Sequence, residues 1–264
     1  MKLFASDYDG TLLYAKHIMP EDLKAIQEWK DAGNQFVIVT GRSKVSIQKQ
    51  IDEYGLPVDF VVTNNGGMVF DKDGKILLSN YLDYITSLDI IYIAKTMEGV
   101  CSYVVNDGIN RHRIVIDDTN EHRYVGLEPD MSEEEVMNMA KYAQIVISMA
   151  EVDLAVSMAD AINQYFGDTV VAYANNYVVD VVPKGISKAT GLDFVCEWTG
   201  IDEKDTYTIG DSYNDIPLME YGIHGAAIET AYDEVKDHAL YVYSSIHEMI
   251  KKIMILMIRG YQIF

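Results

Sequence analysis

The stretch Asp7-Tyr8-Asp9-Gly10-Thr11-Leu12-Leu13 lies near the start of the chain, directly after the apolar run Leu3-Phe4-Ala5-Ser6. The apolar run predicts a buried strand, and the acidic pair predicts its exit. Residues two apart in an extended segment point the same way, so Asp7 and Asp9 can share one pocket. Gly10 permits a sharp turn immediately afterwards. Two carboxylates in one pocket repel each other, so the pair requires either a shared proton or a hard divalent cation such as Mg2+.

An Asp-x-Asp-Gly sequence is also common in solvated turns, so the neighbouring pattern is needed to interpret it. A helix is predicted from Pro20, a strand over 35–40 that ends in Thr40-Gly41-Arg42, a helix capped by Ser43, and a strand over 60–63 that ends in Asn64-Asn65. This β-α-β-α-β order predicts an α/β fold with a parallel sheet. Ligands bind beyond the carboxyl ends of such strands, where Asp7, Thr40 and Asn64 all lie.

The pattern changes in the middle of the chain. Residues 82–182 show mixed helix and strand patterns without carboxylates at strand ends. We therefore expect an inserted α/β domain over 82–182, and a core domain formed by 1–81 together with 183–264. The core pattern resumes with Lys188 at a helix start and with a strand over 206–209 that ends in Gly210-Asp211-Ser212-Tyr213-Asn214-Asp215.

The polar groups at these strand ends are carboxylates, neutral hydrogen-bonding groups, an arginine and a lysine, without histidine or cysteine. Such a set argues against zinc, iron and copper and favours a hard cation with oxygen ligands. Mg2+ usually takes one or two protein carboxylates and leaves room for a substrate phosphate, and Asp7 and Asp211 would supply these. An aspartate can attack phosphorus, and the charge on a transferred phosphoryl group gives Lys188 and Thr40 natural roles.

Taken together, these motifs resemble the haloacid dehalogenase superfamily, and within it the Cof-type (class IIB) phosphatases, over nearly the whole chain. The segment from Asp7 is similar to the first motif of that family, Thr40-Gly41-Arg42 to the second, Lys188 to the third, and the Gly210–Asp215 segment to the fourth. The resemblance implies a Rossmann-like three-layer core with a parallel sheet, and a C2-type α/β cap, which confers substrate specificity, inserted between the second and third motifs.

The resemblance also implies roles for individual residues. Asp7 would be the nucleophile and a Mg2+ ligand, and Asp9 the general acid and base, with its backbone carbonyl on the metal. Asp211 would be a metal ligand, supported or joined by Asp215. The residues that would bind the phosphoryl group or the substrate are Thr40, Gly41, Arg42, Asn65, Lys188 and Asn214.

One loop departs from the family pattern. Relatives often have Met-Gly-Asn-Ala after the strand that follows the fourth motif, whereas this chain has Ile228-Glu229-Thr230-Ala231. The change puts the conformation of this loop and its substrate contacts in question. The histidines His112, His122 and His224 lie apart from the motifs in sequence, and we expect them to be structural or solvated.

Composition narrows the functional class. The chain has 264 residues, 49% of them hydrophobic, so it is long enough for one large domain or two small ones with a sizeable core. The formal net charge of −20 argues against a nucleic acid or an anionic membrane as partner. Cys101 and Cys196 lack metal spacing and are expected to be reduced thiols, and no signal peptide or membrane span is evident. We therefore expect a cytoplasmic protein.

The predicted function is a Mg2+-dependent phosphatase that acts on a small phosphorylated metabolite, such as a sugar phosphate, through an aspartyl-phosphate. One alternative is a phosphomutase, which shares that intermediate and returns the phosphoryl group to the product. The other is a non-catalytic phospho-receiver module. Receivers are shorter, lack a cap and lack an acid two residues after the phosphorylated aspartate, so Asp9 argues against this alternative.

Overall fold

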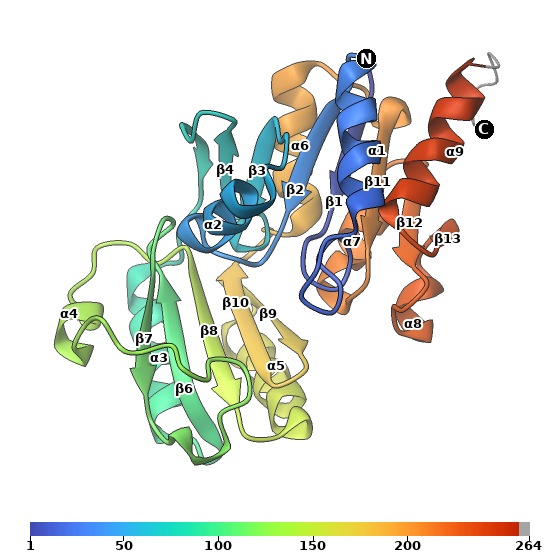
Figure 1. Cartoon of the computed structure of the whole chain (residues 1–264). Coiled ribbons are helices and arrows are strands. Elements are labelled where there is room, and N and C mark those ends of the chain that lie inside the picture. Colours follow the sequence, from blue (N-terminus) through green and yellow to red (C-terminus); the bar gives the residue numbers. More distant parts are fainter. Residues whose placement is uncertain (259–264) are drawn as a thin grey trace.

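The computed structural model describes residues 1–258, which form two sheets lying side by side, each with its own helices (Figure 1). The larger sheet has the order β13-β12-β11-β1-β2-β3-β4-β5. Its strands are β1 (Leu3–Ser6), β2 (Gln35–Val39), β3 (Phe60–Thr63), β4 (Met68–Asp71), β5 (Ile76–Ser79), β11 (Thr206–Gly210), β12 (Gly225–Ile228) and β13 (Tyr241–Tyr243). All neighbours from β13 to β3 are parallel, and β4 and β5 add an antiparallel edge.

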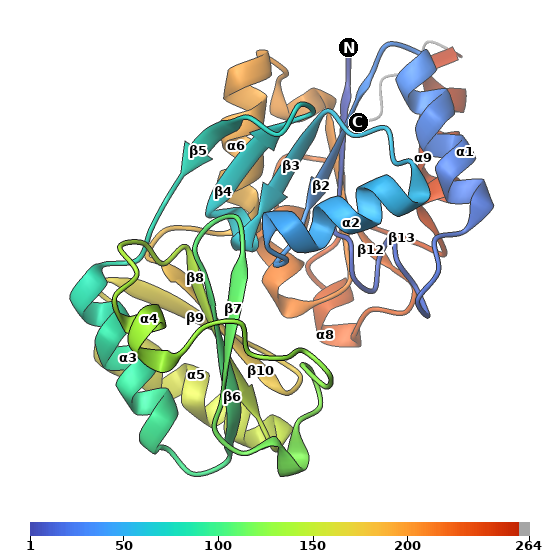
Figure 2. The same ribbon diagram turned by 60° about the vertical axis from the view of Figure 1, so that its left-hand side comes forward.

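Helices cover both faces of this sheet, which makes a three-layer sandwich (Figures 1 and 2). One face carries α1 (Pro20–Asp31), α2 (Lys44–Tyr54), α8 (Asp233–Lys236) and α9 (Ile246–Ile258), and the other carries α6 (Lys188–Thr199) and α7 (Ile216–Met219). Successive strand residues point to opposite faces. Phe4 of β1 accordingly packs with Trp29 of α1, whereas Leu3 packs on the α6 side. The predicted α/β fold with a parallel sheet is confirmed.

The smaller sheet is antiparallel, in the order β7-β6-β8-β10-β9. Its elements are α3 (Tyr84–Thr96), β6 (Val100–Asn106), β7 (Arg111–Val115), α4 (Glu133–Met137), β8 (Gln144–Met149), α5 (Val152–Phe166), β9 (Val170–Asn175) and β10 (Val178–Pro183). The helices α3 and α5 pack on one face around a second hydrophobic core. The other face is turned toward the larger sheet and lines a cavity between the two layers.

Within the described residues, hydrogen bonds at three places join loops and strands of the larger sheet to those of the smaller sheet. The backbone N–H of Val45 in α2 donates to the carbonyl of Ile109 at 3.0 Å. The side-chain amide of Asn64, after β3, donates to Gln144 Oε1 of β8 at 3.1 Å. The Tyr232 hydroxyl donates to Asn176 Oδ1 in the β9–β10 turn at 3.0 Å. The smaller sheet is therefore held against the carboxyl ends of the parallel strands.

Short 3-10 turns follow β3 and β11 at that same edge: Asn64–Gly66 and Tyr213–Asp215. Two further 3-10 turns, Asp118–Asn120 and Glu203–Asp205, lie elsewhere in the chain. Within the part of the chain that the structure describes, no helix combines the length and apolar character that crossing a bilayer requires.

Candidate active site

The loop after β1 brings Asp7 and Asp211 together. Asp7 is buried, and its backbone N–H donates to the carbonyl of Ile209 in β11 at 3.0 Å. Gly10 has a φ of +90°, and a Cβ at this position would overlap the Asp211 carboxylate. The Thr11 hydroxyl donates to Asp211 Oδ1 at 2.7 Å. The glycine therefore provides both the turn and the space for the second acid.

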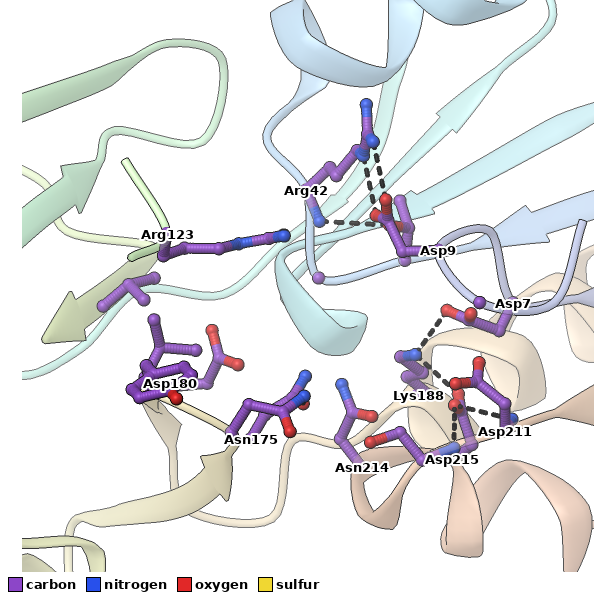
Figure 3. A pocket seen from close by; sticks show the side chains of 18 of the residues that line it. Asp7, Asp9, Arg42, Arg123, Asn175, Asp180, Lys188, Asp211, Asn214 and Asp215 are labelled. Atoms are coloured by element: carbon purple, nitrogen blue, oxygen red, sulfur yellow. Dashed lines mark hydrogen bonds and ion pairs between the residues drawn. The ribbon is translucent and has the colours of Figure 1, made fainter. Parts of the chain in front are cut away.

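Lys188 lies between two of the acids (Figure 3). Its Nζ donates to Asp7 Oδ1 at 2.6 Å and to Asp215 Oδ1 at 2.5 Å. These side chains are almost fully buried, with exposed fractions of 2% for Lys188, 5% for Asp7 and 1% for Asp215. Ser187 caps α6 in a reciprocal capping box with Thr190, which fixes Lys188 as the first residue of the helix, in agreement with the sequence prediction.

Burial and mutual charge set the protonation of this cluster. Burial raises the pKa of Asp7 well above its ordinary value, and the Asp215 charge raises it further, against the opposing effect of Lys188. Burial alone would lower the pKa of Lys188, but the charges of Asp215 and Asp7 outweigh it and raise that pKa. Burial, with the charge of Asp215, raises the pKa of Asp211 to about 6. The cluster thus holds more negative charge than one lysine neutralises.

This acidic excess fits a divalent cation. The carboxylates of Asp7, Asp211 and Asp215 each offer one oxygen, and these oxygens lie within 4.8 Å of one another. Lys188 takes one oxygen of Asp7 and Thr11 takes one oxygen of Asp211, which leaves the second oxygen of each for a cation. Buried oxygen donors without nitrogen or sulfur suit a hard ion. That the backbone carbonyl of Asp9 joins them stays a prediction.

Asp9 faces the same cavity but has a different partner. Arg42 donates from Nε to Asp9 Oδ2 at 2.7 Å and from Nη2 to Asp9 Oδ1 at 2.6 Å (Figure 3). Burial alone would raise the pKa of Asp9, but the hydrogen bonds and charge of Arg42 outweigh it and hold that pKa below its ordinary value. Asp7 and Asp9 therefore differ in environment, one beside a lysine and two acids, the other beside an arginine.

The remaining predicted residues fall into two groups. Thr40, Gly41 and Asn214 line the cavity, and the Thr40 hydroxyl accepts from the backbone N–H of Arg42 at 3.2 Å. Asn65 is 1% exposed and lies behind the cavity wall, where its Oδ1 accepts from the Asn214 side-chain amide at 3.1 Å. In this structure Asn65 therefore contacts Asn214 and does not line the cavity.

The cavity has a volume of about 620 Å³ and is lined from the smaller sheet as well as from the motif loops. The sequence motifs do not indicate these further lining residues: Asn106, Arg111, His122, Arg123, Tyr124, Asn175, Tyr177 and Asp180. One signal was present for Asp180, because it interrupts the apolar run Val178-Val179-Asp180-Val181-Val182 of β10. An acid at a buried strand position indicates a polar environment.

Two residues that the sequence analysis discussed outside the predicted site, His122 and Thr230, line the cavity. His122, which was expected to be structural or solvated, is solvent-exposed, and it also lines the cavity and stacks on Tyr177 with ring centroids 4.1 Å apart. The loop 116–127 returns over the open face of the smaller sheet, a path that local sequence does not reveal. Thr230, part of the loop that departs from the family pattern, also lines the cavity, so that departure falls at the site itself.

Comparison with known proteins agrees with this architecture. The family described as haloacid dehalogenase-like hydrolase matches residues 4–249. The chain is similar to the 5-amino-6-(5-phospho-D-ribitylamino)uracil phosphatase YwtE of Bacillus subtilis, with 24% identity over 93% of each chain. Among solved structures, it is similar in fold to a haloacid dehalogenase-like hydrolase from B. subtilis, with a TM-score of 0.82, 20% identity, and 95% and 99% of the two chains covered.

A second solved structure with the same fold is the subclass IIB sugar phosphatase BT4131, with a TM-score of 0.80, 20% identity, and 98% and 99% of the two chains covered. The resemblance to Cof-type hydrolases that the motifs indicated is confirmed. Because the family match spans both halves of the large sheet and the segment between them, this chain belongs to the haloacid dehalogenase-like hydrolase family.

Proposed function

We propose that this hydrolase is a Mg2+-dependent phosphatase that acts on small phosphorylated metabolites through an aspartyl-phosphate on Asp7. The observation that carries the proposal is the buried ion cluster in which Lys188 bridges Asp7 and Asp215 beside Asp211. A cationic group and a hard cation on either side of a buried carboxylate are what a phosphate dianion needs in order to approach an anionic nucleophile.

In the first step, a carboxylate oxygen of Asp7 attacks phosphorus while the bond between phosphorus and the ester oxygen breaks. The leaving oxygen takes a proton from Asp9, which lies on the same cavity wall. Lys188 stabilises the charge on the transferred phosphoryl group, and Thr40 donates its hydroxyl to it. The products of this step are the free alcohol and phosphorylated Asp7.

In the second step, water attacks the phosphorus of the aspartyl-phosphate and gives its proton to Asp9, now a carboxylate. The bond between Asp7 and phosphorus breaks, and inorganic phosphate leaves. Mg2+, held by Asp7 and Asp211 with support from Asp215, would supply charge neutralisation when bound. Arg42 has to release Asp9 before Asp9 can carry a proton, because a bidentate arginine favours the carboxylate.

We assign residues 82–182 as an inserted cap that covers the site and selects the substrate, and residues 1–81 with 183–264 as the catalytic core. Support comes from the cavity, whose walls belong to both segments. A volume of about 620 Å³ suits a small metabolite. The two relatives described above act, by their names, on a phosphorylated ribitylaminouracil and on sugar phosphates.

The test is phosphate release from an aryl phosphate and from a panel of phosphorylated metabolites, with Mg2+ and with EDTA. We expect turnover with Mg2+ and none with EDTA. Asp7→Asn should abolish turnover, whereas the control Asp73→Asn, in an exposed turn between β4 and β5, should leave it unchanged. Retained turnover in Asp7→Asn, with the fold verified by circular dichroism, would disprove the nucleophile. An isomerised product instead of free phosphate would replace the phosphatase with a phosphomutase.

A further inference from the structure

Three arginines converge on the cavity: Arg42 from the core, Arg111 at the start of β7, and Arg123 from the loop that follows β7. Figure 3 shows the Arg123 side chain extended into the cavity from the cap side, toward Arg42 and Asp9. The protein as a whole has a formal net charge of −20. The arginines lie toward the cap side of the cavity, whereas Asp7, Asp211 and Asp215 lie at the motif end, so positive charge is local to the cap side.

Among the arginines that the structure describes, Arg111 and Arg123 differ from Arg42 and Arg113 in having no acidic partner within ion-pair distance. Arg42 binds Asp9, and the buried Arg113 binds Asp118 and Glu121. Within residues 1–258, no carboxylate oxygen lies within the 4.0 Å of an ion pair from Arg111 or Arg123. Burial lowers the pKa of Arg111, and the neighbouring charges of Arg42 and Arg123 lower it further. Three adjacent cations repel one another unless an anion lies between them.

The acids nearest to this group have other partners. Asp9 is bound through both oxygens by Arg42. Asp180 of β10 accepts from the side-chain amide of Gln144 at 2.5 Å, and burial raises its pKa to about 6. Within residues 1–258, neither carboxylate forms an ion pair within 4.0 Å of Arg111 or Arg123, although the charge of Arg123 acts at longer range to lower the pKa of both.

The loop that carries Arg123 is held in place in advance. Glu121 is buried beneath it, and its Oε1 accepts from the backbone N–H groups of Arg123 at 2.9 Å and of Tyr124 at 3.0 Å. Ser102 and Ser148, from β6 and β8, donate to the same carboxylate at 2.5 and 2.7 Å. A cation fixed by buried hydrogen bonds loses less entropy when it binds a ligand than one on a free loop does.

We propose that Arg111 and Arg123 form a binding site for a second anionic group, a carboxylate or a second phosphate, carried by the leaving group of the substrate. This inference rests on the proposed phosphatase activity and narrows its substrate class. Guanidinium groups match the planar geometry of both anions and bind them through paired hydrogen bonds. The transferred phosphoryl group is bound separately, by Lys188 and Thr40 at the motif end of the cavity.

The experiment uses two substrate pairs that differ only in the second anion. 3-Phosphoglycerate and glycerol 3-phosphate test for a carboxylate, and glucose 1,6-bisphosphate and glucose 6-phosphate test for a phosphate. We expect kcat/KM to favour the doubly anionic member of at least one pair by at least ~10-fold. Arg123→Gln and Arg111→Gln should each reduce this preference, and Arg123→Lys should retain part of it.

Lys141→Gln is the matched control, because it removes one positive charge from the exposed cap surface away from the cavity. It should leave the preference unchanged. Equal kcat/KM values within both pairs would overturn the proposal. The proposal would also be overturned if Arg123→Gln lowered kcat/KM equally for both substrates of a pair. That result would place the arginine on the transferred phosphoryl group or in a structural role.

Binding to Asp7→Asn protein separates this proposal from the phosphatase activity, because the variant holds ligands without turnover. Isothermal titration should show tighter binding of the doubly anionic ligand, and the added change Arg123→Gln should remove the difference. If this preference is present while the wild-type protein releases no phosphate, the anion site stands and the proposed activity fails. If phosphate is released but neither pair shows a preference in binding or turnover, the anion site fails alone.

Discussion

Arg42 binds both carboxylate oxygens of Asp9, at 2.7 Å from Nε and 2.6 Å from Nη2, while its guanidinium lies over the Tyr8 ring, 4.8 Å from the centroid. Paired charge-assisted hydrogen bonds of this length strongly favour the ionised acid. This arrangement favours the ionised form of Asp9, which can accept a proton. In the proposed mechanism, proton donation by Asp9 to a leaving group would require Arg42 to move to another anion, and a substrate with an anionic leaving group would supply one.

Arg42→Gln should raise the pKa of Asp9. With the guanidinium removed, burial, which favours the neutral acid, is opposed only by the weaker effects of the Arg123 and Lys188 charges. A 13C titration of the Asp9 carboxyl in metal-free protein measures the change directly. Lys44→Gln, which removes a charge from the neighbouring helix α2, is the control and should leave the pKa of Asp9 unchanged. An unchanged or lower pKa in Arg42→Gln would contradict the assigned ion pair.

Lys188→Met should increase the affinity for Mg2+ while abolishing turnover. The ammonium competes with a cation for Asp7 and Asp215, and its loss leaves a more negative carboxylate cluster that binds a divalent cation more tightly. Isothermal titration with Mg2+ should show tighter binding, and EDTA should lower the melting temperature more than in the wild type. The control Lys44→Gln should bind Mg2+ as the wild type does. Weaker binding in Lys188→Met would show that the lysine positions the carboxylates and does not compete with the ion.

The core of the site could be predicted from sequence because its residues come directly after predicted strands. Once β1 and β11 are placed in one parallel sheet, Asp7 and Asp211 must approach each other at its carboxyl edge. The Ser187 cap likewise follows from local sequence and places Lys188 at the helix start. The pattern of apolar residues predicts the strands and helices, and the geometry of a parallel sheet then brings the strand ends together.

The cap side of the site could not be predicted in this way. Arg111, His122 and Arg123 reach the cavity because the segment after β7 folds back over the open face of the sheet. That path depends on the buried Glu121 network, in which Ser102 and Ser148 lie 19 and 27 residues from Glu121 in the chain. Asp9 and Arg42 are likewise 33 residues apart in the chain, and their ion pair forms only when the tertiary fold brings them together.

Glu121→Gln should destabilise the cap in a pH-dependent way. Burial opposes the ionised form of Glu121, but hydrogen bonds from Ser102, Ser148 and two backbone N–H groups outweigh it and lower its pKa from about 4.5 to about 2. Because the folded pKa lies below the unfolded one, the stabilisation is fully present above pH ~4.5 and is lost as the pH falls toward 2. We expect a loss on the order of 2 kcal/mol in the free energy of unfolding at pH 7.

Urea unfolding followed by circular dichroism at pH 7, 5 and 3 tests this expectation. The difference in the free energy of unfolding between the wild type and Glu121→Gln should be similar at pH 7 and pH 5 and smaller at pH 3. Glu128→Gln, an exposed change in the same loop, should have little effect at any of the three values. A difference that does not change with pH would show that the lost hydrogen-bond geometry, and not the charge of Glu121, stabilises the loop.

Gly66→Ala should disturb the active site through the backbone alone. Gly66 has a φ of +102°, and a Cβ there would overlap the carbonyl oxygen of Ser187, the residue that caps α6 and precedes Lys188. Gly74 is the matched control, with a φ of +80° and open space around its Cβ position. Gly74→Ala should cost only the backbone strain, about 1 to 2 kcal/mol in urea unfolding. Gly66→Ala should cost more and should also lower kcat, because relief of the overlap displaces the start of α6, which carries Lys188. Equal stability losses in the two variants, with kcat unchanged in Gly66→Ala, would show that the contact between Gly66 and Ser187 does not position the lysine.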